Sequence, residues 1–473
     1  MKIINLTTNS RVRVINNRTD VWNVLRTVVD SETQEDAFYI CDIGEVVRKH
    51  KIWKILMPRV VPHYAVKCND NRAILEVLAA LGTGFDCASK AEINKVLSLG
   101  VDSDRIIFAN PAKPASHIRH AALTGVNTMT FDNETELHKI KNFFPEAKLV
   151  VRIRCDAKVA QCQLGMKFGC DATTEAPYLL SVARDLGLDV VGVSFHVGSG
   201  CGEPDAFRRA IASSRTVFDY AATLGYNFNL LDIGGGYPGR REDTLEPIAK
   251  IINDSLDKYF PDPHVRVIAE PGRYYVTSAY TLACNIHSIR TIKTEDPITK
   301  EITSHYMYYI NDGVYGSFNC ILYDHQVVIP QPFKNCDGLE LHSSSIWGPT
   351  CDGLDQVIEE CMLPELKVGE WLIFEDMGAY TLPVASPFNG FPVPKVHIIA
   401  DENTWDLLKG ILPLREDHFI FGQTPANIRA SLQNDDNSWI FPKLPITVSI
   451  SKCNSNSIIQ EHVLELVDIS LFQ

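Results

Sequence analysis

The chain has 473 residues, of which 45% are hydrophobic and 22% charged, a composition typical of a globular protein of about two domains. Its 58 acidic side chains outnumber its 45 basic ones. The net charge of −13 argues against a nucleic-acid-binding protein and favours a cationic small molecule as ligand. No apolar run reaches the ~18 residues of a membrane span, no secretory signal is visible, and the 13 cysteines include no Cys-x-x-Cys pair, so we expect a reduced, cytoplasmic protein.

Short β-branched runs alternate with longer amphipathic runs between residues 62 and 273. The runs predicted as strands are 63–67, 84–89, 105–110, 128–132, 148–154, 190–197, 230–236 and 265–272. The segments between them have helical periodicity, and several end in a glycine, which stops a helix. Eight strand–helix units in unbroken alternation predict an α/β fold, a (β/α)8 TIM-like barrel. A doubly wound open sheet is the alternative, but no GxGxxG motif follows the first strand.

After residue 273 the predicted strands are separated by turns instead of long helices, which indicates a second, mainly β domain. We therefore divide the chain into an N-terminal segment at 1–36 that joins the β domain, a barrel at 37–280, the β domain at 281–400 and a tail at 401–473. The sequence contains no internal repeat and no low-complexity tract.

Charged or titratable side chains close several predicted barrel strands, where the active site of such a barrel lies. They are Lys67, Asp86, Arg152, Arg154, His196 and Glu270, followed by Arg273, and Gly234, Gly235 and Gly236 close the seventh strand. Taken singly, each has an ordinary explanation as a solvated lysine, a core histidine, a surface arginine or a sharp turn.

Together, these residues match the parts of pyridoxal phosphate. A desolvated lysine such as Lys67 is a nucleophile for an aldehyde. The backbone N–H groups of the three glycines suit a phosphate, and Arg273 can supply its counter-charge. The ring of His196 can stack on a planar cofactor, and Glu270 can pair with a protonated ring nitrogen. No metal site is predicted, because no histidine pair at helical spacing has a third ligand.

The predicted β domain contains its own candidates. Cys351 and Asp352 lie in a Gly/Pro-bounded segment, 343–355, which is typical of a functional loop. Asp324 and Tyr380 are further candidates, although each taken alone is more often a turn or surface residue.

Eight sequence runs resemble the eukaryotic ornithine decarboxylase family, which belongs to the alanine-racemase-fold, pyridoxal-phosphate-dependent group IV decarboxylases. The runs are YAVKCND, GFDCASK, FHVGSGC, LDIGGGYPG, IAEPGRYY, NDGVYGSFNCILYDH, SSIWGPTCDGLD and MGAYT. They occur in family order between about residue 36 and residue 400. The resemblance implies a barrel with a β domain, pyridoxal 5'-phosphate as cofactor, and decarboxylation of L-ornithine to putrescine in polyamine biosynthesis.

By this resemblance, Lys67 corresponds to the Schiff-base lysine, His196 to the histidine that stacks on the cofactor ring, and Glu270 to the partner of the pyridine nitrogen. The residues that correspond to phosphate contacts are Ser199, Gly234, Gly235, Gly236, Arg273 and Tyr380. Asp86 and Arg152 match family positions around the cofactor.

Cys351 resembles the cysteine that protonates the decarboxylated intermediate. Asp324 and Asp352 resemble the carboxylates that hold the distal ammonium of the substrate, and Tyr323 and Phe388 are further candidate substrate contacts. The resemblance also implies a homodimer in which Cys351 and Asp352 reach into the barrel of the neighbouring subunit, so that two active sites are shared.

A basic segment from Lys113 to Lys141 includes Arg119 and Lys139. It matches the family region that binds the protein antizyme, although a solvated face of the barrel explains the same charges equally well. We expect antizyme binding as one possibility and the solvated face as the other.

Two alternative functions stay open. The first is a non-catalytic regulator that resembles antizyme inhibitor, which keeps the fold but loses cofactor-binding residues. The second is a decarboxylase of lysine or arginine, because a carboxylate accepts any distal cation. Departures from the family pattern at His63, Asp376 and Pro387 leave the rate and the substrate preference open.

Overall fold

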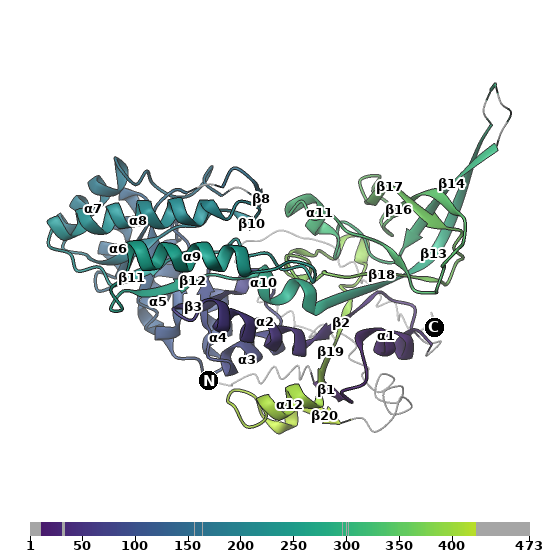
Figure 1. Ribbon diagram of the computed structural model, residues 1–473, viewed down its shortest axis with the longest axis horizontal. Helices are drawn as coiled ribbons and strands as arrows, with labels where there is room; N and C mark the ends of the chain where they lie inside the picture. The colour runs from purple at the N-terminus through teal and green to yellow at the C-terminus, as the bar shows by residue number, and fades with distance from the viewer. Residues whose placement is uncertain are drawn as a thin grey trace, which may run out of the picture.

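The computed structural model describes residues 11–30, 34–155, 157–162, 164–295, 297–298, 300 and 302–421, which form a barrel beside a mainly β domain (Figure 1). Eight parallel strands close the barrel in the order β11, β12, β3, β4, β5, β6, β7 and β9. Their bounds are β3 Val60–Ala65, β4 Gly84–Cys87, β5 Ile106–Phe108, β6 Thr128–Phe131, β7 Lys148–Arg152, β9 Asp189–Ser194, β11 Leu230–Asp232 and β12 Arg266–Ala269. The predicted barrel with a second, mainly β domain is confirmed.

Helices surround the barrel and connect its strands (Figure 1). They are α2 Ile43–Leu56, α3 Arg72–Ala80, α4 Lys90–Leu97, α5 Ala115–Thr124, α6 Glu134–Phe143, α7 Glu175–Asp185, α8 Asp205–Thr223, α9 Glu246–Tyr259 and the short α10 Arg273–Val276. Local sequence signals set their ends. Ser89 Oγ accepts the N–H of Glu92 at 3.3 Å where α4 begins, and Gly125, at φ 75°, ends α5 in the left-handed region.

The barrel strands end earlier than the sequence predicted, and the functional residues follow them on turns. Strand β3 ends at Ala65, so Lys67 lies on a 3-10 turn, Val66–Cys68. Strand β11 ends before the glycines, because Gly234 and Gly236 have φ values of 62° and 114°, which a strand does not allow. These turns place the candidate residues above the barrel mouth.

The interior of the barrel is filled by a small cluster of buried aliphatic side chains. Its members are Ile107, Ala109, Val150, Leu230 and Ile268. They come from or directly follow β5, β7, β11 and β12. Such a barrel is a packed core, and its active site lies at the carboxyl ends of the strands.

The β domain is built on a ten-stranded sheet, with the order β17, β16, β14, β13, β2, β19, β1 and β20 and with β15 and β18 off this path. Its strands are β1 Val12–Ile15, β2 Phe38–Asp42, β13 Tyr280–Glu295, β14 Ile302–Ile310, β15 Gln331–Pro332, β16 Leu341–Trp347, β17 Gln356–Pro364, β18 Trp371–Phe374, β19 Lys395–Asp401 and β20 Phe419–Phe421. Its helices are α1 Val21–Val29, α11 Asn319–Tyr323 and α12 Glu402–Leu408. The hairpin of β13 and β14 projects from the body of the molecule (Figure 1).

The two ends of the described chain meet in the β sheet. Strand β2 pairs with β13 and β19, so residues 38–42, which the predicted boundaries put in the barrel, lie in this sheet. Within the predicted tail, β20 pairs with β1, and the remainder of the tail, 422–473, lies outside the described residues. None of the described helices combines the length and the apolar character needed to cross a membrane.

Candidate active site

Lys67 is held at the barrel mouth by an ion pair. Its Nζ donates to Oδ2 of Asp86, the fully buried carboxylate at the end of β4, while the Lys67 side chain is 39% exposed. Burial lowers the pKa of Lys67, but the charges of Asp86 and Glu270 outweigh this effect and raise it above its ordinary value. The other oxygen of Asp86, Oδ1, is buried without a hydrogen-bond partner among the described residues. Lys67 is therefore a pre-positioned ammonium beside an incompletely satisfied carboxylate.

Two buried carboxyl groups lie together at the ends of β11 and β12. Burial raises the pKa of Glu270 well above its ordinary value, and the negative charges of Asp232 and Asp86 add to this effect. Burial also raises the pKa of Asp232 to about 6, although its Oδ1 accepts the N–H of Gly234 at 2.9 Å. Two adjacent carboxylates that cannot both ionise hold a proton between them. Asp232 was not predicted as a site residue, although it too closes an apolar strand.

His196 presents a neutral ring beside the glycine-rich turn. Its Nδ1 accepts the N–H of Gly198 at 3.0 Å, which places the ring proton on Nε2. Burial lowers the pKa of His196 well below its ordinary value, and the nearby charge of Arg152 lowers it further. A Cβ at Gly235 would lie 2.7 Å from His196 Nε2 and 2.9 Å from the carbonyl oxygen of Glu270, so the turn requires glycine here.

Three predicted phosphate contacts come together around Arg273, which is 8% exposed. Its Nη2 and Nε donate to Ser199 Oγ at 2.7 and 3.2 Å, and its guanidinium lies 5.2 Å from the ring centroid of Tyr380. Tyr380 has a φ of 54°, and its N–H donates to the carbonyl of Cys68 at 2.9 Å. A non-glycine residue in this region is held by its surroundings, here by the turn that carries Lys67.

Asp324 joins the predicted phosphate contacts to the predicted substrate contacts. It follows α11, is 5% exposed, and accepts from Nη2 of Arg273 at 2.8 Å on Oδ1 and 3.0 Å on Oδ2. Burial alone lowers the pKa of Arg273, but the Asp324 carboxylate more than offsets this and raises it. The predicted phosphate contact Arg273 and the predicted substrate contact Asp324 are therefore direct neighbours.

Arg152 closes β7, with its guanidinium 5.3 Å from the ring centroid of Phe168. Its carbonyl accepts the N–H of Cys170 at 3.0 Å. Its charge also lowers the pKa of His196, so these two predicted cofactor contacts are electrostatic neighbours, and the role of Arg152 at the cofactor stays a prediction.

Cys351 and Asp352 are not brought to Lys67 within one chain. Cys351 is exposed, and its N–H donates to Oδ1 of Asn389 at 3.0 Å. Asp352 accepts from the hydroxyl of Tyr315, whose ring centroid lies 4.4 Å from that of Phe388. All these partners belong to the β domain, so the loop is ordered by contacts that do not involve the barrel.

The positions that depart from the family pattern are structural. His63 is buried against Gly84, where a Cβ would lie 2.3 Å from the imidazole, and burial lowers its pKa to about 3. Asp376 has a φ of 58°, a conformation that asparagine and aspartate tolerate better than most residues, and its Oδ1 accepts the N–H of Arg241 at 3.2 Å. Pro387 precedes the turn that carries Phe388.

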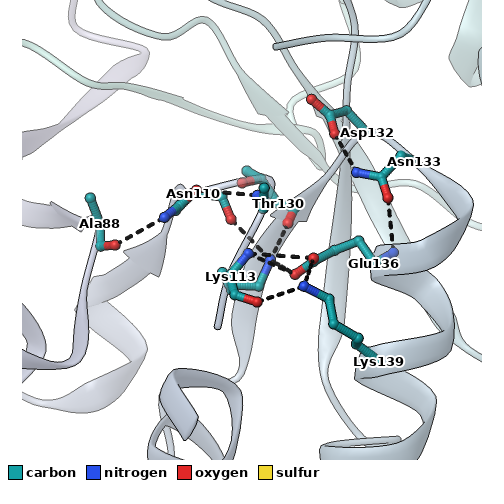
Figure 2. A network of polar contacts seen from close by, with 9 residues as sticks. Ala88, Asn110, Lys113, Thr130, Asp132, Asn133, Glu136 and Lys139 are labelled. Carbon is teal, nitrogen blue, oxygen red and sulfur yellow. Dashed lines mark hydrogen bonds and ion pairs between the residues drawn. The ribbon is translucent and has the colours of Figure 1, made fainter. Parts of the chain in front are cut away.

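Two lysines of the basic segment, Lys113 and Lys139, belong to a network of polar contacts around Glu136 (Figure 2). Lys113 is 1% exposed, and its Nζ donates to the carbonyls of Thr130 at 2.6 Å and Asn110 at 3.0 Å. Glu136 pairs with Nζ of Lys113 at 2.9 Å and with Nζ of Lys139 at 2.6 Å. Burial lowers the pKa of Lys113 to about 8. A lysine enclosed in this way adds no charge to a surface, so the prediction was wrong for Lys113.

Comparison with known proteins identifies the family. Residues 43–277 match the family model described as pyridoxal-dependent decarboxylase, pyridoxal binding domain. The ornithine decarboxylase of Mus musculus is 52% identical over 396 residues, which cover 81% of this chain and 85% of the relative. This chain belongs to the pyridoxal-dependent decarboxylase family.

Two further relatives bear on the function. Antizyme inhibitor 2 of Xenopus laevis is 48% identical over 384 residues, covering 79% of this chain and 84% of the relative. The crystal structure of the arginine decarboxylase of Paramecium bursaria Chlorella virus, bound to agmatine, superposes with a TM-score of 0.76 at 37% identity. The superposition covers 80% of this chain and 100% of the chain of the arginine decarboxylase.

The residues present fit pyridoxal phosphate. Arg273 donates to Ser199, Lys67 pairs with Asp86, and burial raises the pKa of Glu270, as suits a partner for a protonated ring nitrogen. Among the described residues, no group of three or more His, Cys, Asp or Glu side chains is arranged to hold a metal ion. The enzyme is a pyridoxal-phosphate-dependent decarboxylase.

The raised pKa of Glu270 predicts a pH dependence of stability. Between the unfolded value of about 4 and the higher folded value, the folded protein binds more protons than the unfolded chain, so stability falls as the pH rises. Glu270→Gln should make this fall shallower between about pH 5 and pH 8. Urea midpoints of protein dialysed free of cofactor measure the effect, with the exposed Glu359→Gln as control. Equal slopes for wild type and Glu270→Gln would contradict the assignment.

Proposed function

We propose that the enzyme decarboxylates L-ornithine to putrescine and carbon dioxide. The observation that carries this proposal is the buried carboxylate of Asp324. It lies beside Arg273 and Ser199, the proposed phosphate contacts, where it can hold the distal ammonium of a bound amino acid. The identity to a relative named ornithine decarboxylase supports the same substrate.

The cofactor, when bound, supplies an electron sink for the carbanion left at the α-carbon of the substrate. Asp86 orients Lys67 and holds its proton at Nζ until the amine is needed as a nucleophile. Glu270, whose pKa is raised by burial, would share a proton with the ring nitrogen of the cofactor. His196 offers a flat, neutral face, and Arg273 anchors the phosphate.

Cys351 and Asp352 complete the proposed chemistry. The Sγ of Cys351 would return a proton to the α-carbon after carbon dioxide leaves, and Asp352 would share the distal ammonium with Asp324. Tyr323 and Phe388, which are 70% and 41% exposed, would close the substrate side of the pocket.

The structure of the site favours an enzyme over a regulator that resembles antizyme inhibitor. Such a regulator lacks cofactor-binding residues, whereas Asp86, Arg152 and Arg273 are present here and enclosed at the barrel mouth. The preference among ornithine, lysine and arginine needs a separate test. The Asp324 carboxylate can pair with the distal cation of any of the three, and one structural relative is an arginine decarboxylase.

Product formation from three substrates tests the proposal. We expect kcat/KM for ornithine to exceed that for lysine and arginine by at least about tenfold, because the extra methylene of lysine and the larger guanidinium of arginine displace the distal cation relative to Asp324. Mass spectrometry of putrescine, cadaverine and agmatine gives the rates, with Lys67→Ala as the inactive control. Absence of all three products would favour the regulator, and a higher rate with lysine or arginine would replace ornithine as the substrate.

We also infer a homodimer with shared active sites. Cys351 and Asp352 make their contacts within the β domain and not with Lys67, so a second subunit would have to supply them. Large apolar side chains are exposed in the same domain, including Leu354 at 74% and Phe391 at 40%. Exposed apolar side chains near a functional loop suit a protein interface.

Subunit mixing tests the shared site. Lys67→Ala and Cys351→Ala should each be nearly inactive, and random pairing makes about half of the dimers mixed, each with one intact site. Activity should then return to roughly a quarter of wild type. Mass labelling verifies exchange; if exchange occurs and no activity returns, each barrel works alone.

The remaining basic surface is the proposed antizyme site. Arg119 and Lys141 are exposed, and Arg119 lies 4.8 Å from the ring centroid of Phe143. Lys139 forms an ion pair with the buried Glu136, so reversing its charge would disturb the fold.

A cytoplasmic location is proposed on separate grounds, since the twelve cysteines of the described part are free thiols.

The double variant Arg119→Glu, Lys141→Glu should reduce antizyme binding by at least about tenfold and leave decarboxylation unchanged, because both residues lie away from the barrel mouth. The matched control is Lys51→Glu, Lys258→Glu, which reverses two exposed lysines on other helices. Calorimetry measures the affinity. Unchanged binding in the first variant would favour a merely solvated face.

A further inference from the structure

A small two-stranded sheet outside the closed barrel contacts Asp324 through Gln161. Strands β8 Ala160–Cys162 and β10 Ser199–Cys201 pair antiparallel, with Ser199 opposite Cys162. Nε2 of Gln161 donates to the backbone carbonyl of Asp324 and, at 3.2 Å, to its Oδ2. The same small sheet therefore carries a predicted phosphate contact, Ser199, and a direct contact to the predicted substrate carboxylate.

The orientation of the Gln161 amide is determined by its partners. Both groups that it meets on Asp324 are acceptors, so its nitrogen and not its oxygen must face them. Gly200 gives the side chain its space, since a Cβ at Gly200 would lie 2.7 Å from Gln161 Oε1. Gly200 also has a φ of 59°, so a side chain at this position would be strained as well as too close.

Gln161 and Arg273 bind Asp324 in chemically different ways. Arg273 brings a full positive charge to both carboxylate oxygens, whereas Gln161 brings a neutral donor to Oδ2. A neutral donor fixes the carboxylate without cancelling its charge. Because Asp324 is 5% exposed, water replaces such a donor poorly.

We propose that Gln161 is a positioning residue for substrate recognition: it keeps Asp324 turned toward the distal ammonium of the substrate while Arg273 serves the phosphate. This inference rests on the proposed function of Asp324. It assigns a part in substrate preference to the small sheet of β8 and β10, whereas the other proposed substrate contacts belong to the β domain.

The test is a double-mutant cycle between Gln161 and Asp324. Gln161→Leu removes the donor at similar volume and should raise KM for ornithine about fivefold, with kcat changed less than about twofold. The cofactor dissociation constant, from absorbance titration, and the melting temperature should stay at wild-type values. In the Asp324→Asn background, Gln161→Leu should raise KM no further, because the two residues act as one unit.

Two further variants sharpen the cycle. Gln161→Glu is nearly isosteric and places a like charge against Asp324, so it should raise KM more than Gln161→Leu, and it serves if the leucine variant does not fold. Gln331→Leu is the matched control, since Nε2 of this half-buried glutamine also faces a carboxylate oxygen, Glu375 Oε2, at 3.4 Å. It should leave KM unchanged.

The outcomes separate this inference from the proposed function. If Asp324→Asn raises KM and neither Gln161 variant does, the role of Gln161 is overturned and that of Asp324 stands. If Gln161→Leu raises KM by the same factor with and without Asp324→Asn, Gln161 does not act through Asp324. If Asp324→Asn leaves KM for ornithine unchanged, both assignments fail.

Discussion

The site is organised by the need to stabilise charges that are buried at the mouth of a barrel with an apolar interior. Asp86, Glu270 and Arg273 are each at most 8% exposed, and an ionised group in such a place needs a partner or a proton. Lys67 pairs with Asp86, Asp324 pairs with Arg273, and burial raises the pKa of Glu270. In the proposed function, each of these groups makes one contact to pyridoxal phosphate or to the substrate, so a single electrostatic constraint accounts for the geometry of the site.

The barrel and most of the cofactor residues could be predicted because parallel strands leave a regular pattern. Apolar runs that end in a charged residue gave Lys67, Asp86 and Glu270 directly, since the carboxyl ends of barrel strands meet at one face. The glycine turn was predicted for the same reason, and its φ values explain why β11 ends before it. The roles of Asp324, Asp352 and Cys351 came only from the family resemblance, because no periodicity links a β-domain loop to a barrel.

The remaining features depend on contacts between residues distant in sequence. From the sequence, Lys113 was predicted as a surface lysine. In the structure it is enclosed by Glu136 and by backbone carbonyls that come together only when the chain folds. Asp232 has the same sequence signal as Asp86 and Glu270, an apolar strand closed by a carboxylate. The glycines that follow it were predicted as the functional residues of this strand end instead. Gln161 has no sequence signal at all, since its partner lies 163 residues away.

The central claim is that Lys67, placed among these paired charges, is the residue that bonds to the cofactor. Borohydride reduction of the protein loaded with pyridoxal phosphate, followed by digestion and mass spectrometry, measures this directly. The account predicts that the cofactor mass is fixed on the peptide that contains Lys67 and that Lys67→Ala acquires none. Cofactor fixed to another lysine, or an unlabelled wild-type protein, would contradict it.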